Sequence, residues 1–151
     1  MINKLEHLIP PPLVALLIAV AIWYGTTAPS TPGPLRWSLI GLLIACGLAL
    51  DFSAIISFLK RHTTVNPLAP DHASQLVTDG MYRFTRNPMY LGLALNLSAW
   101  GLYLGSWLLL PALLVFVGYI TRFQILPEER ALQLKFGTDF TSYCNTVRRW
   151  L

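Results

Sequence analysis

Four long apolar segments, separated by polar stretches, dominate the pattern of the chain. They lie near residues 8–25, 35–59, 88–105 and 106–126. A helix that spans a membrane needs about 20 mostly apolar residues, so the second and fourth segments are long enough and the third is short but adequate. The first suffices only if Leu8, Ile9 and the three prolines after them lie at the interface. The pattern predicts an all-α, polytopic membrane protein of about four transmembrane helices, with one domain over residues 1–151.

The first segment also has the outline of a signal peptide. Lys4 precedes its apolar core, and the Thr-Thr-Ala run before Pro29 is weakly similar to a cleavage site. The three prolines ahead of the core are unusual in a signal peptide. A retained helix is therefore the preferred interpretation, and the signal peptide stays open as the alternative.

Composition supports the membrane interpretation. Of the 151 residues, 54% are hydrophobic and 12% are charged, and the mean hydropathy is +0.53. A soluble domain carries about 25% charged residues. The net charge is +4, but the cations are scattered beside apolar segments. They therefore fit a surface of membrane lipids better than nucleic acid, and no nucleic-acid partner is expected.

The positions of the cations predict an orientation. Nearly all Lys and Arg residues lie near the N-terminus, in the loop 60–87 or toward the tail 127–151, and only Arg36 falls on the other side. Cytoplasmic loops of membrane proteins carry the excess of Lys and Arg. Both termini, the loop and the tail are therefore expected in the cytoplasm, at the inner membrane. Within the tail, a short amphipathic helix is predicted, with Gly137 as its C-cap.

No metal site and no disulfide are predicted. The three histidines, His7, His62 and His72, lack the spacing of a helical metal site. Cys46 falls in an apolar segment and Cys144 in the polar tail, so a disulfide bond between them is not expected.

A polar cluster stands directly before the third apolar segment, in the run "TRNPMYLG" (85–92). Pro88 suits the first turn of a helix, and it biases Asn87 away from helical geometry, which leaves the Asn87 amide free to bind. Tyr90 lies one turn inside and its hydroxyl needs a partner. From the residues alone, this stretch is either a capped helix start or a binding site.

Two acids, Glu128 and Glu129, follow the fourth segment. Acids suit the first turn of a helix because of the helix dipole. Two carboxylates opposite Arg86 would equally favour a cationic ligand. Asp51, within the second segment, is a functional candidate by its depth alone, or else a hydrogen-bond partner of a neighbouring helix through Asn96 or Ser98.

The run "QLVTDGMYRFTRNPMYLG" (75–92) resembles the signature of the isoprenylcysteine carboxyl methyltransferase family and its phospholipid methyltransferase relatives. That signature is close to L-V-x-x-G-x-Y-x-x-x-R-[HN]-P-x-Y-x-G. It is filled here by Leu76, Val77, Gly80, Tyr82, Arg86, Asn87, Pro88, Tyr90 and Gly92. Glu128 and Glu129 match the second element of the family. The stretches "TTVNP" (63–67) and "KFGTDFTSY" (135–143) are also similar, so the resemblance covers most of residues 60–147.

The resemblance implies an integral membrane methyltransferase that uses S-adenosylmethionine and methylates a lipophilic acceptor. Arg86, which would steer an anionic part of the acceptor, and Glu129 are the implied catalytic residues. The implied cofactor-binding residues are Leu76, Val77, Gly80, Tyr82, Asn87, Pro88, Tyr90, Glu128 and Glu129. The chain has no GxGxxG run, so loops and helix ends would hold the cofactor in place of a nucleotide-binding sheet.

Asn87 stands where the isoprenylcysteine enzymes have a histidine. Asparagine cannot accept a proton at neutral pH, so a mechanism that needs a base at this position is excluded. A prenylcysteine-like carboxylate and the amine of a lipid both remain open as the methyl acceptor. The "GLYLG" run, Gly101 to Gly105, allows close helix packing and also a homodimer.

Two other functions stay open. The run "KFGTDFTSYCNTV" (135–147) also resembles the C-terminal end of membrane sterol reductases, which would imply NADPH. The second alternative is a small membrane protein without enzymatic activity that binds anionic lipid through the basic run at residues 60–62. Both leave the pairing of the Arg86–Pro88 stretch with Glu128 and Glu129 unexplained.

Overall fold

The structure, a computed structural model, describes residues 6, 8–27, 30–60 and 76–151. Lys4, the "TTVNP" stretch, His7, His62, His72 and most of the expected loop 60–87 lie outside the described residues. The described part of the chain is helical and contains no strand, which confirms the all-α fold class.

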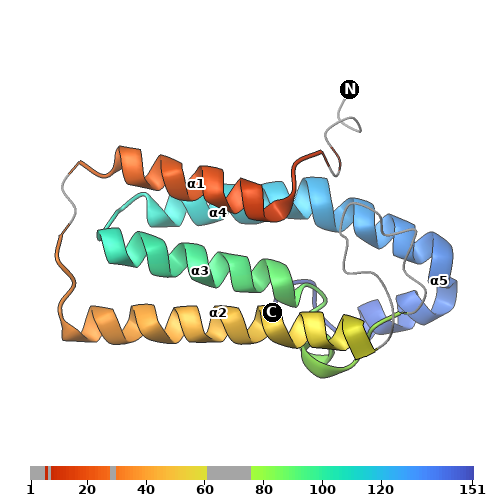
Figure 1. Ribbon diagram of the computed structural model, residues 1–151. Coiled ribbons are helices and arrows are strands. Elements are labelled where there is room, and N and C mark those ends of the chain that lie inside the picture. The colour runs from red at the N-terminus through yellow and green to blue at the C-terminus, as the bar shows by residue number, and fades with distance from the viewer. Residues whose placement is uncertain (1–5, 7, 28–29, 61–75) are drawn as a thin grey trace.

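The described helices follow the expected apolar segments closely. They are α1 (Pro11–Gly25), α2 (Pro34–Lys60), the 3-10 helix η3 (Gly80–Arg83), α3 (Pro88–Leu104), α4 (Leu109–Ile120), the π-helix η4 (Thr121–Ile125) and α5 (Leu126–Thr146). Pro11 and Pro88 each occupy a first helical position, where a missing N–H costs nothing. Helices α1 to α4 lie side by side (Figure 1), and α3 contacts α1, α2 and α4.

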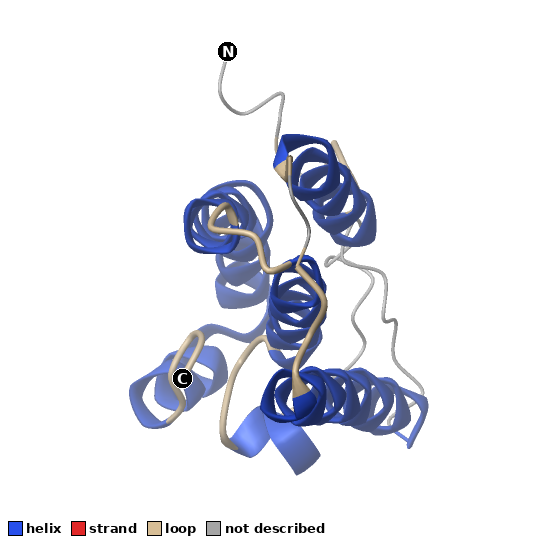
Figure 2. Ribbon diagram, turned by 90° about the vertical axis from the view of Figure 1, so that its left-hand side faces the viewer, coloured by secondary structure: helices blue, strands red, loops and turns tan. Residues whose placement is uncertain are grey.

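Helix α3 is therefore the centre of the bundle, as the view along the helices shows (Figure 2). Its closest neighbour is α2, and small residues allow the approach. A Cβ atom added to Gly92 would lie 2.9 Å from the backbone oxygen of Gly47, and the Asp51 carboxyl group lies against the same glycine. Asp51 thus packs on α3 at Gly92, and Ser98 donates its hydroxyl hydrogen bond to the carbonyl of Ala94 at 2.7 Å.

The outer surface of the bundle is apolar. Large hydrophobic side chains are exposed along α1, α2 and α4, among them Leu16, Leu42, Phe52, Leu110 and Leu114. Among the described residues, two helical runs are long and apolar enough to cross a membrane, Pro34–Ser57 and Leu109–Thr146, and only 22% of the most apolar window of each is buried, unlike the core helix of a soluble protein. Helices α1, with 15 residues, and α3, with 17, are shorter. Membrane association follows from this surface, whereas the four-span topology stays a prediction.

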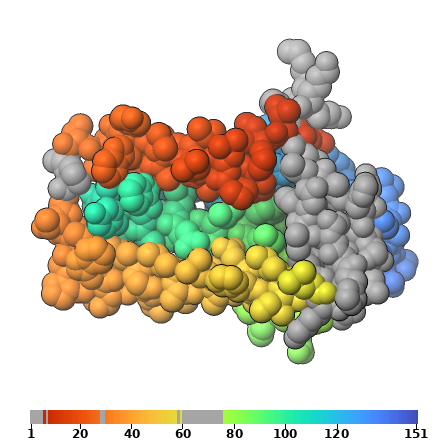
Figure 3. Space-filling model, in the orientation of Figure 1, coloured from red at the N-terminus to blue at the C-terminus, as the bar shows by residue number. Residues whose placement is uncertain are grey.

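The two ends of the bundle differ in character. At one end, the rings of Trp23, Trp100, Tyr103 and Trp37 form a row across α1, α3 and α2, with neighbouring centroids 5.7 to 5.8 Å apart. At the same end Gly105, with a φ of 62°, closes the tight turn between α3 and α4. The start of α1, η3 and α5 lie toward the opposite end (Figures 1 and 3). The C-terminal residues lie beside the start of α3.

Helix α5 turns back on itself at Gly137. This residue has a φ of 52° and a ψ of −119°, and it separates two helical pieces. The predicted short helix does break at Gly137, but a second piece continues to Thr146. Phe140, Tyr143 and Val147 of this returning part form a buried cluster. The turn brings the last residues of the chain back to the start of α3.

Candidate active site

Glu129 is the centre of the polar end of the bundle, and two guanidinium groups meet its carboxylate. Arg86 Nη2 lies 3.1 Å from Glu129 Oε1, and the side chains of the two residues are 11% and 17% exposed. Arg149 donates from Nε to Oε1 at 3.0 Å and from Nη2 to Oε2 at 2.7 Å. Its hydrogen bond to Glu129 raises the pKa of the Arg149 guanidinium. Both oxygens of the carboxylate are thus held in place.

Glu128, the neighbouring acid, faces a different partner. The Tyr90 hydroxyl donates to Glu128 Oε1 at 2.5 Å. Glu128 lies beyond Leu126, where the expected apolar segment ends. Burial raises the pKa of its carboxyl group to about 8; the Tyr90 hydrogen bond opposes this rise and the negative charge of Glu129 adds to it. The two acids are adjacent in sequence but serve separate contacts.

The C-terminal residues line the start of α3. The Arg86 backbone N–H donates to the carbonyl of Arg148 at 3.0 Å, within an isolated parallel bridge between Thr85 and Arg148. The Asn87 amide donates from Nδ2 to the carbonyl of Arg149 at 2.9 Å. The sequence suggested a free Asn87 amide, but its nitrogen is engaged by the tail.

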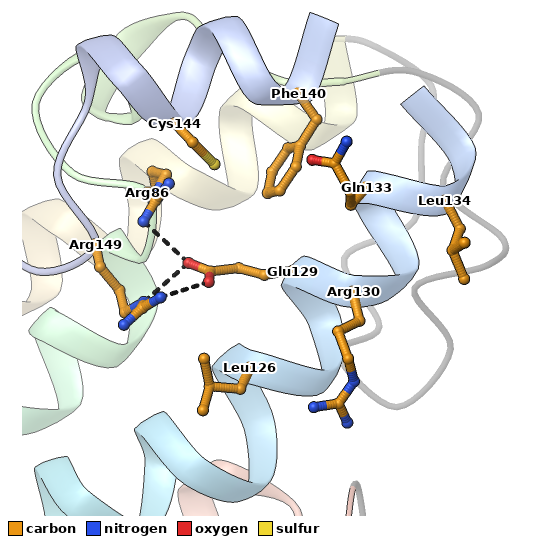
Figure 4. Close-up of a pocket in the computed structure, with 9 residues that line it drawn as sticks. All are labelled: Arg86, Leu126, Glu129, Arg130, Gln133, Leu134, Phe140, Cys144 and Arg149. Carbon is orange, nitrogen blue, oxygen red and sulfur yellow. Dashed lines mark hydrogen bonds and ion pairs between the residues drawn. The ribbon is translucent and has the colours of Figure 1, made fainter. Parts of the chain in front are cut away.

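An open pocket of about 700 Å³ lies beside Glu129. Figure 4 shows Glu129 pointing from α5 toward Arg86 and Arg149 on the facing segments. Its wall combines charged and apolar side chains: Arg86, Leu126, Glu129, Arg130, Gln133, Leu134, Phe140, Cys144 and Arg149. Small-molecule sites usually measure about 300 to 1,000 Å³. The pocket is therefore of suitable size for a ligand with both polar and apolar parts.

The remaining residues of the motif form the support beside this pocket. Val77 and Tyr82 are buried with Ala54 of α2. Gly80 has a φ of 59°, and a Cβ atom there would lie 2.8 Å from the Ser57 hydroxyl oxygen. Tyr82 accepts, at its backbone carbonyl, a hydrogen bond of 2.6 Å from the Tyr143 hydroxyl.

Leu76 packs on the cluster of the returning part of α5, and Pro88 is buried in the first turn of α3. The structure thus brings Arg86, Asn87, Tyr90 and the two acids to one end of the bundle. Leu76, Val77, Gly80 and Tyr82 lie in the adjoining packing layer.

The site also contains residues that the sequence did not single out. Arg149, Cys144 and Gln133 line the pocket, and Tyr143 fixes η3 through its hydroxyl group. In the sequence, the tail contributed only to the predicted orientation in the membrane and to the resemblance to known families. The two arginines before Trp150 were the available signal for a site residue. Such a pair does not reveal which carboxylate it contacts.

A second set of contacts ties the N-terminal segment to the junction of α4 and α5. Gln124, fully buried in the π-helix η4, donates to the carbonyl of Ile9 at 2.8 Å. Glu6 accepts from Arg122 at 3.3 Å and from Arg130 at 2.6 Å. Hydrogen bonding to Arg130 is the largest cause that lowers the pKa of Glu6. These contacts hold the start of α5, and with it Glu128 and Glu129.

Among the described residues, no group of three or more His, Cys, Asp or Glu side chains could hold a metal ion. Cys46 and Cys144 are both free. The polar end therefore offers guanidinium, carboxylate, amide and hydroxyl groups as its chemistry.

The chain is similar to known proteins at two levels, that of a relative and that of a family. A protein of Haemophilus influenzae described as an uncharacterized protein is 46% identical over 63 residues, which make up 42% of this chain and 100% of that protein. No solved structure matches the chain significantly. Residues 36–139 match the family described as phospholipid methyltransferase, and this range covers α2, α3, α4 and the start of the returning part of α5. Because the match spans more than half of the chain and includes both acids and the Arg86–Tyr90 stretch, the chain belongs to the phospholipid methyltransferase family.

Proposed function

We propose that this protein transfers a methyl group from S-adenosylmethionine to a lipophilic acceptor at the cytoplasmic face of the membrane. The observation that carries the proposal is the contact between Arg86 and Glu129, at 3.1 Å. These residues belong to the two separate elements of the family motif. They meet at the polar end of a bundle whose outer surface is apolar.

The pocket beside Glu129 fits the chemistry of this methyl donor. The donor carries a carboxylate, an ammonium group, ribose hydroxyls and a flat base. Arg86 Nε is buried and lacks a hydrogen-bond partner among the described residues, so it can donate to an anionic oxygen of an acceptor bound beside the donor. Glu129 can accept from an ammonium or hydroxyl group, and Leu126, Leu134 and Phe140 supply apolar surface for the base.

The bound donor would supply a methyl group that is already activated for transfer. The protein's task is then mainly to place the acceptor in line with that group, and orientation of this kind lowers barriers by about 7 to 11 kcal/mol at best. In this proposal Glu129 and the residues of the Leu76–Tyr90 stretch other than Arg86 hold the donor. Arg86 attracts an anionic part of the acceptor.

The protonation state of the acceptor decides which further group is needed. A carboxylate acceptor attacks without a base, whereas an amine must first lose its proton. Asn87 cannot take that proton. Glu128 has a carboxyl pKa of about 8, near neutral pH, but it faces Tyr90 and does not line the pocket. A carboxylate acceptor therefore needs no base from this site, whereas an amine would have to arrive without its proton.

The proposed arrangement in the membrane follows from the two ends of the bundle. All four helices would cross the inner membrane, with both termini and the site on the cytoplasmic side, where the cations gather. A water-soluble donor would then reach the site from the cytoplasm. A lipid acceptor would enter sideways from the bilayer between the helices.

Calorimetry on detergent-purified protein tests the proposal, with S-adenosylhomocysteine and NADPH titrated separately. We expect S-adenosylhomocysteine to bind the wild type and Asp139→Asn, a control acid that is exposed on α5. Glu129→Ala should weaken this binding at least about tenfold, because it removes a half-buried charged partner. Binding of NADPH alone would favour a reductase, and a folded protein that binds neither would favour a function without catalysis.

A further inference from the structure

The last five residues, 147–151, cross the site although they lie beyond the family match, which ends at residue 139. Their backbone is fixed at two points. The carbonyl of Arg148 accepts from the Arg86 N–H at 3.0 Å, and the carbonyl of Arg149 accepts from the Asn87 amide at 2.9 Å. Trp150 Nε1 also donates to the Thr121 hydroxyl at 3.1 Å. The tail is thus held by two separate parts of the bundle, the segment just before α3 and the π-helix η4.

This placement directs the Arg149 side chain at Glu129. The guanidinium group donates from two nitrogens, one to each carboxylate oxygen, at 3.0 and 2.7 Å. A planar fork of this kind fixes the rotation of a carboxylate as well as its position. For Arg86, in contrast, the recorded contact with Glu129 is a single ion pair, from Nη2 to Oε1 at 3.1 Å. Of the two guanidinium groups, Arg149 is therefore the one that sets the plane of the Glu129 carboxylate.

The contact differs from an ordinary surface ion pair. Exposed pairs contribute little because two long side chains must be ordered for one weak attraction. Here the Glu129 side chain is 17% exposed and that of Arg149 is 36% exposed, and the Arg149 backbone is already held by Asn87. The backbone contact of the tail thus already restricts Arg149, so less side-chain entropy is lost when its two hydrogen bonds to Glu129 form.

We propose that Arg149 is a positioning residue of the site, which fixes the Glu129 carboxylate in the orientation that binds the methyl donor, and that the C-terminal tail is a component of the active site. This inference rests on the proposed function, because it assigns Glu129 to donor binding. Arg149 acts through Glu129, and its neighbour Arg148 contributes only backbone.

The test is calorimetry with S-adenosylhomocysteine on the full-length protein, for Arg149→Gln, Arg149→Lys and the control Arg148→Gln. The Arg148 side chain is exposed, so this control removes the same charge one residue away. We expect Arg149→Gln to weaken binding by roughly tenfold. In metal sites, removing a group that orients a metal-binding side chain lowers the metal affinity by about 10- to 100-fold, and we take the lower end of that range. Arg149→Lys keeps the charge but not the fork, so its affinity should lie between those of Arg149→Gln and the wild type. Arg148→Gln should bind as the wild type does.

A second measurement needs no ligand. The thermal midpoints of Arg149→Gln, Glu129→Gln and the double variant form a double-mutant cycle. If the two side chains act through one contact, the double variant should unfold close to the less stable single variant. Additive shifts would contradict the contact.

The outcomes separate the two proposals. A wild type that does not bind S-adenosylhomocysteine contradicts the proposed function. A wild type that binds, together with Arg149→Gln or Arg149→Lys at wild-type affinity, contradicts the positioning role. If Arg149→Gln does not fold, Arg149→Lys still decides between these results.

Discussion

Glu128 and Glu129 show how two neighbouring acids take different tasks. Successive residues of an α-helix point about 100° apart. Glu128 therefore reaches Tyr90 of α3, whereas Glu129 reaches Arg86 and Arg149. Only the second carboxylate lines the pocket. Glu128 and Glu129 look like a pair in the sequence, but their different side-chain partners give them different positions in the site.

Replacement of Tyr90 by phenylalanine tests the first of these contacts. Tyr90 is 7% exposed, and its hydroxyl donates to Glu128. The variant leaves a partly buried carboxyl group without its donor, so we expect a loss of about 1 to 3 kcal/mol in unfolding free energy. Denaturant unfolding in detergent, followed by tryptophan fluorescence, measures it. Tyr24→Phe is the control, since Tyr24 is 81% exposed; an equal loss there would contradict the assignment.

The raised pKa of Glu128 predicts a pH dependence of stability. Its pKa is about 8 in the folded protein against an ordinary value of 4.5, so the folded state holds the proton more tightly than the unfolded state. The free energy of unfolding should therefore fall as the pH rises from about 5 to about 8. The slope is at most about 1.4 kcal/mol per pH unit for one proton.

Glu128→Gln has no proton to lose at this position and provides the comparison. Unfolding free energies of both proteins, measured from pH 5 to pH 9, should differ by an amount that changes up to about pH 8 and then levels off. Parallel curves over the whole range would show that the carboxyl group titrates normally.

At the scale of elements, the contact of α2 with α3 places the site. Gly47 and Gly92 allow these helices to approach until a Cβ atom on Gly92 would lie 2.9 Å from the backbone oxygen of Gly47. Backbone cannot rotate away as a side chain can. The end of α2 also packs against η3, where Ser57 lies next to Gly80.

Gly92→Ala should therefore push α2 and α3 apart. We expect a loss of roughly 1 to 3 kcal/mol in unfolding free energy, the usual cost of an overpacked core. Gly41→Ala on α2 is the matched control, because nothing lies within 4 Å of its added Cβ atom, and it should lose no stability. Thermal or denaturant unfolding of both variants decides. A Gly92→Ala protein as stable as the wild type would mean that α2 and α3 lie farther apart at Gly92 than the structure shows.

At the scale of the molecule, the polar groups collect at one end and the aromatic row at the other. Trp and Tyr are enriched where membrane proteins meet the interface. The row of Trp23, Trp100, Tyr103 and Trp37 at the far end is consistent with such a boundary. The site end then corresponds to the opposite face, where the sequence predicts the cytoplasm.

Cysteine labelling tests this orientation with residues that the chain already has. The Cys46→Ser variant leaves Cys144, which lines the pocket at the site end. A membrane-impermeant maleimide should label it in inverted inner-membrane vesicles and leave it unlabelled in intact spheroplasts, because cation-rich segments stay in the cytoplasm. Labelling in spheroplasts alone would reverse the predicted topology. Cys46→Ser, Cys144→Ser is the control without a thiol.

Much of the fold could be predicted from the sequence. Apolar runs interrupted by proline and polar clusters mark helices α1 to α4, because only a helix satisfies its own backbone hydrogen bonds in an apolar medium. The resemblance of the Arg86–Tyr90 stretch and the two acids to a known signature indicated the family, which the match over residues 36–139 confirmed. Helix ends were less well predicted: α1 begins at Pro11 and not near residue 8.

Only the tertiary structure decided how these residues combine. Arg149 meets Glu129 because the chain reverses at Gly137, and the pattern of apolar positions does not fix the angle between the two pieces of α5. The engagement of the Asn87 amide by the tail was hidden for the same reason, since its partner lies 62 positions away. The sequence by itself determined which segments are helical and which chemical groups stand at their ends. Long-range packing determined which carboxylate faces the pocket and which guanidinium group holds it.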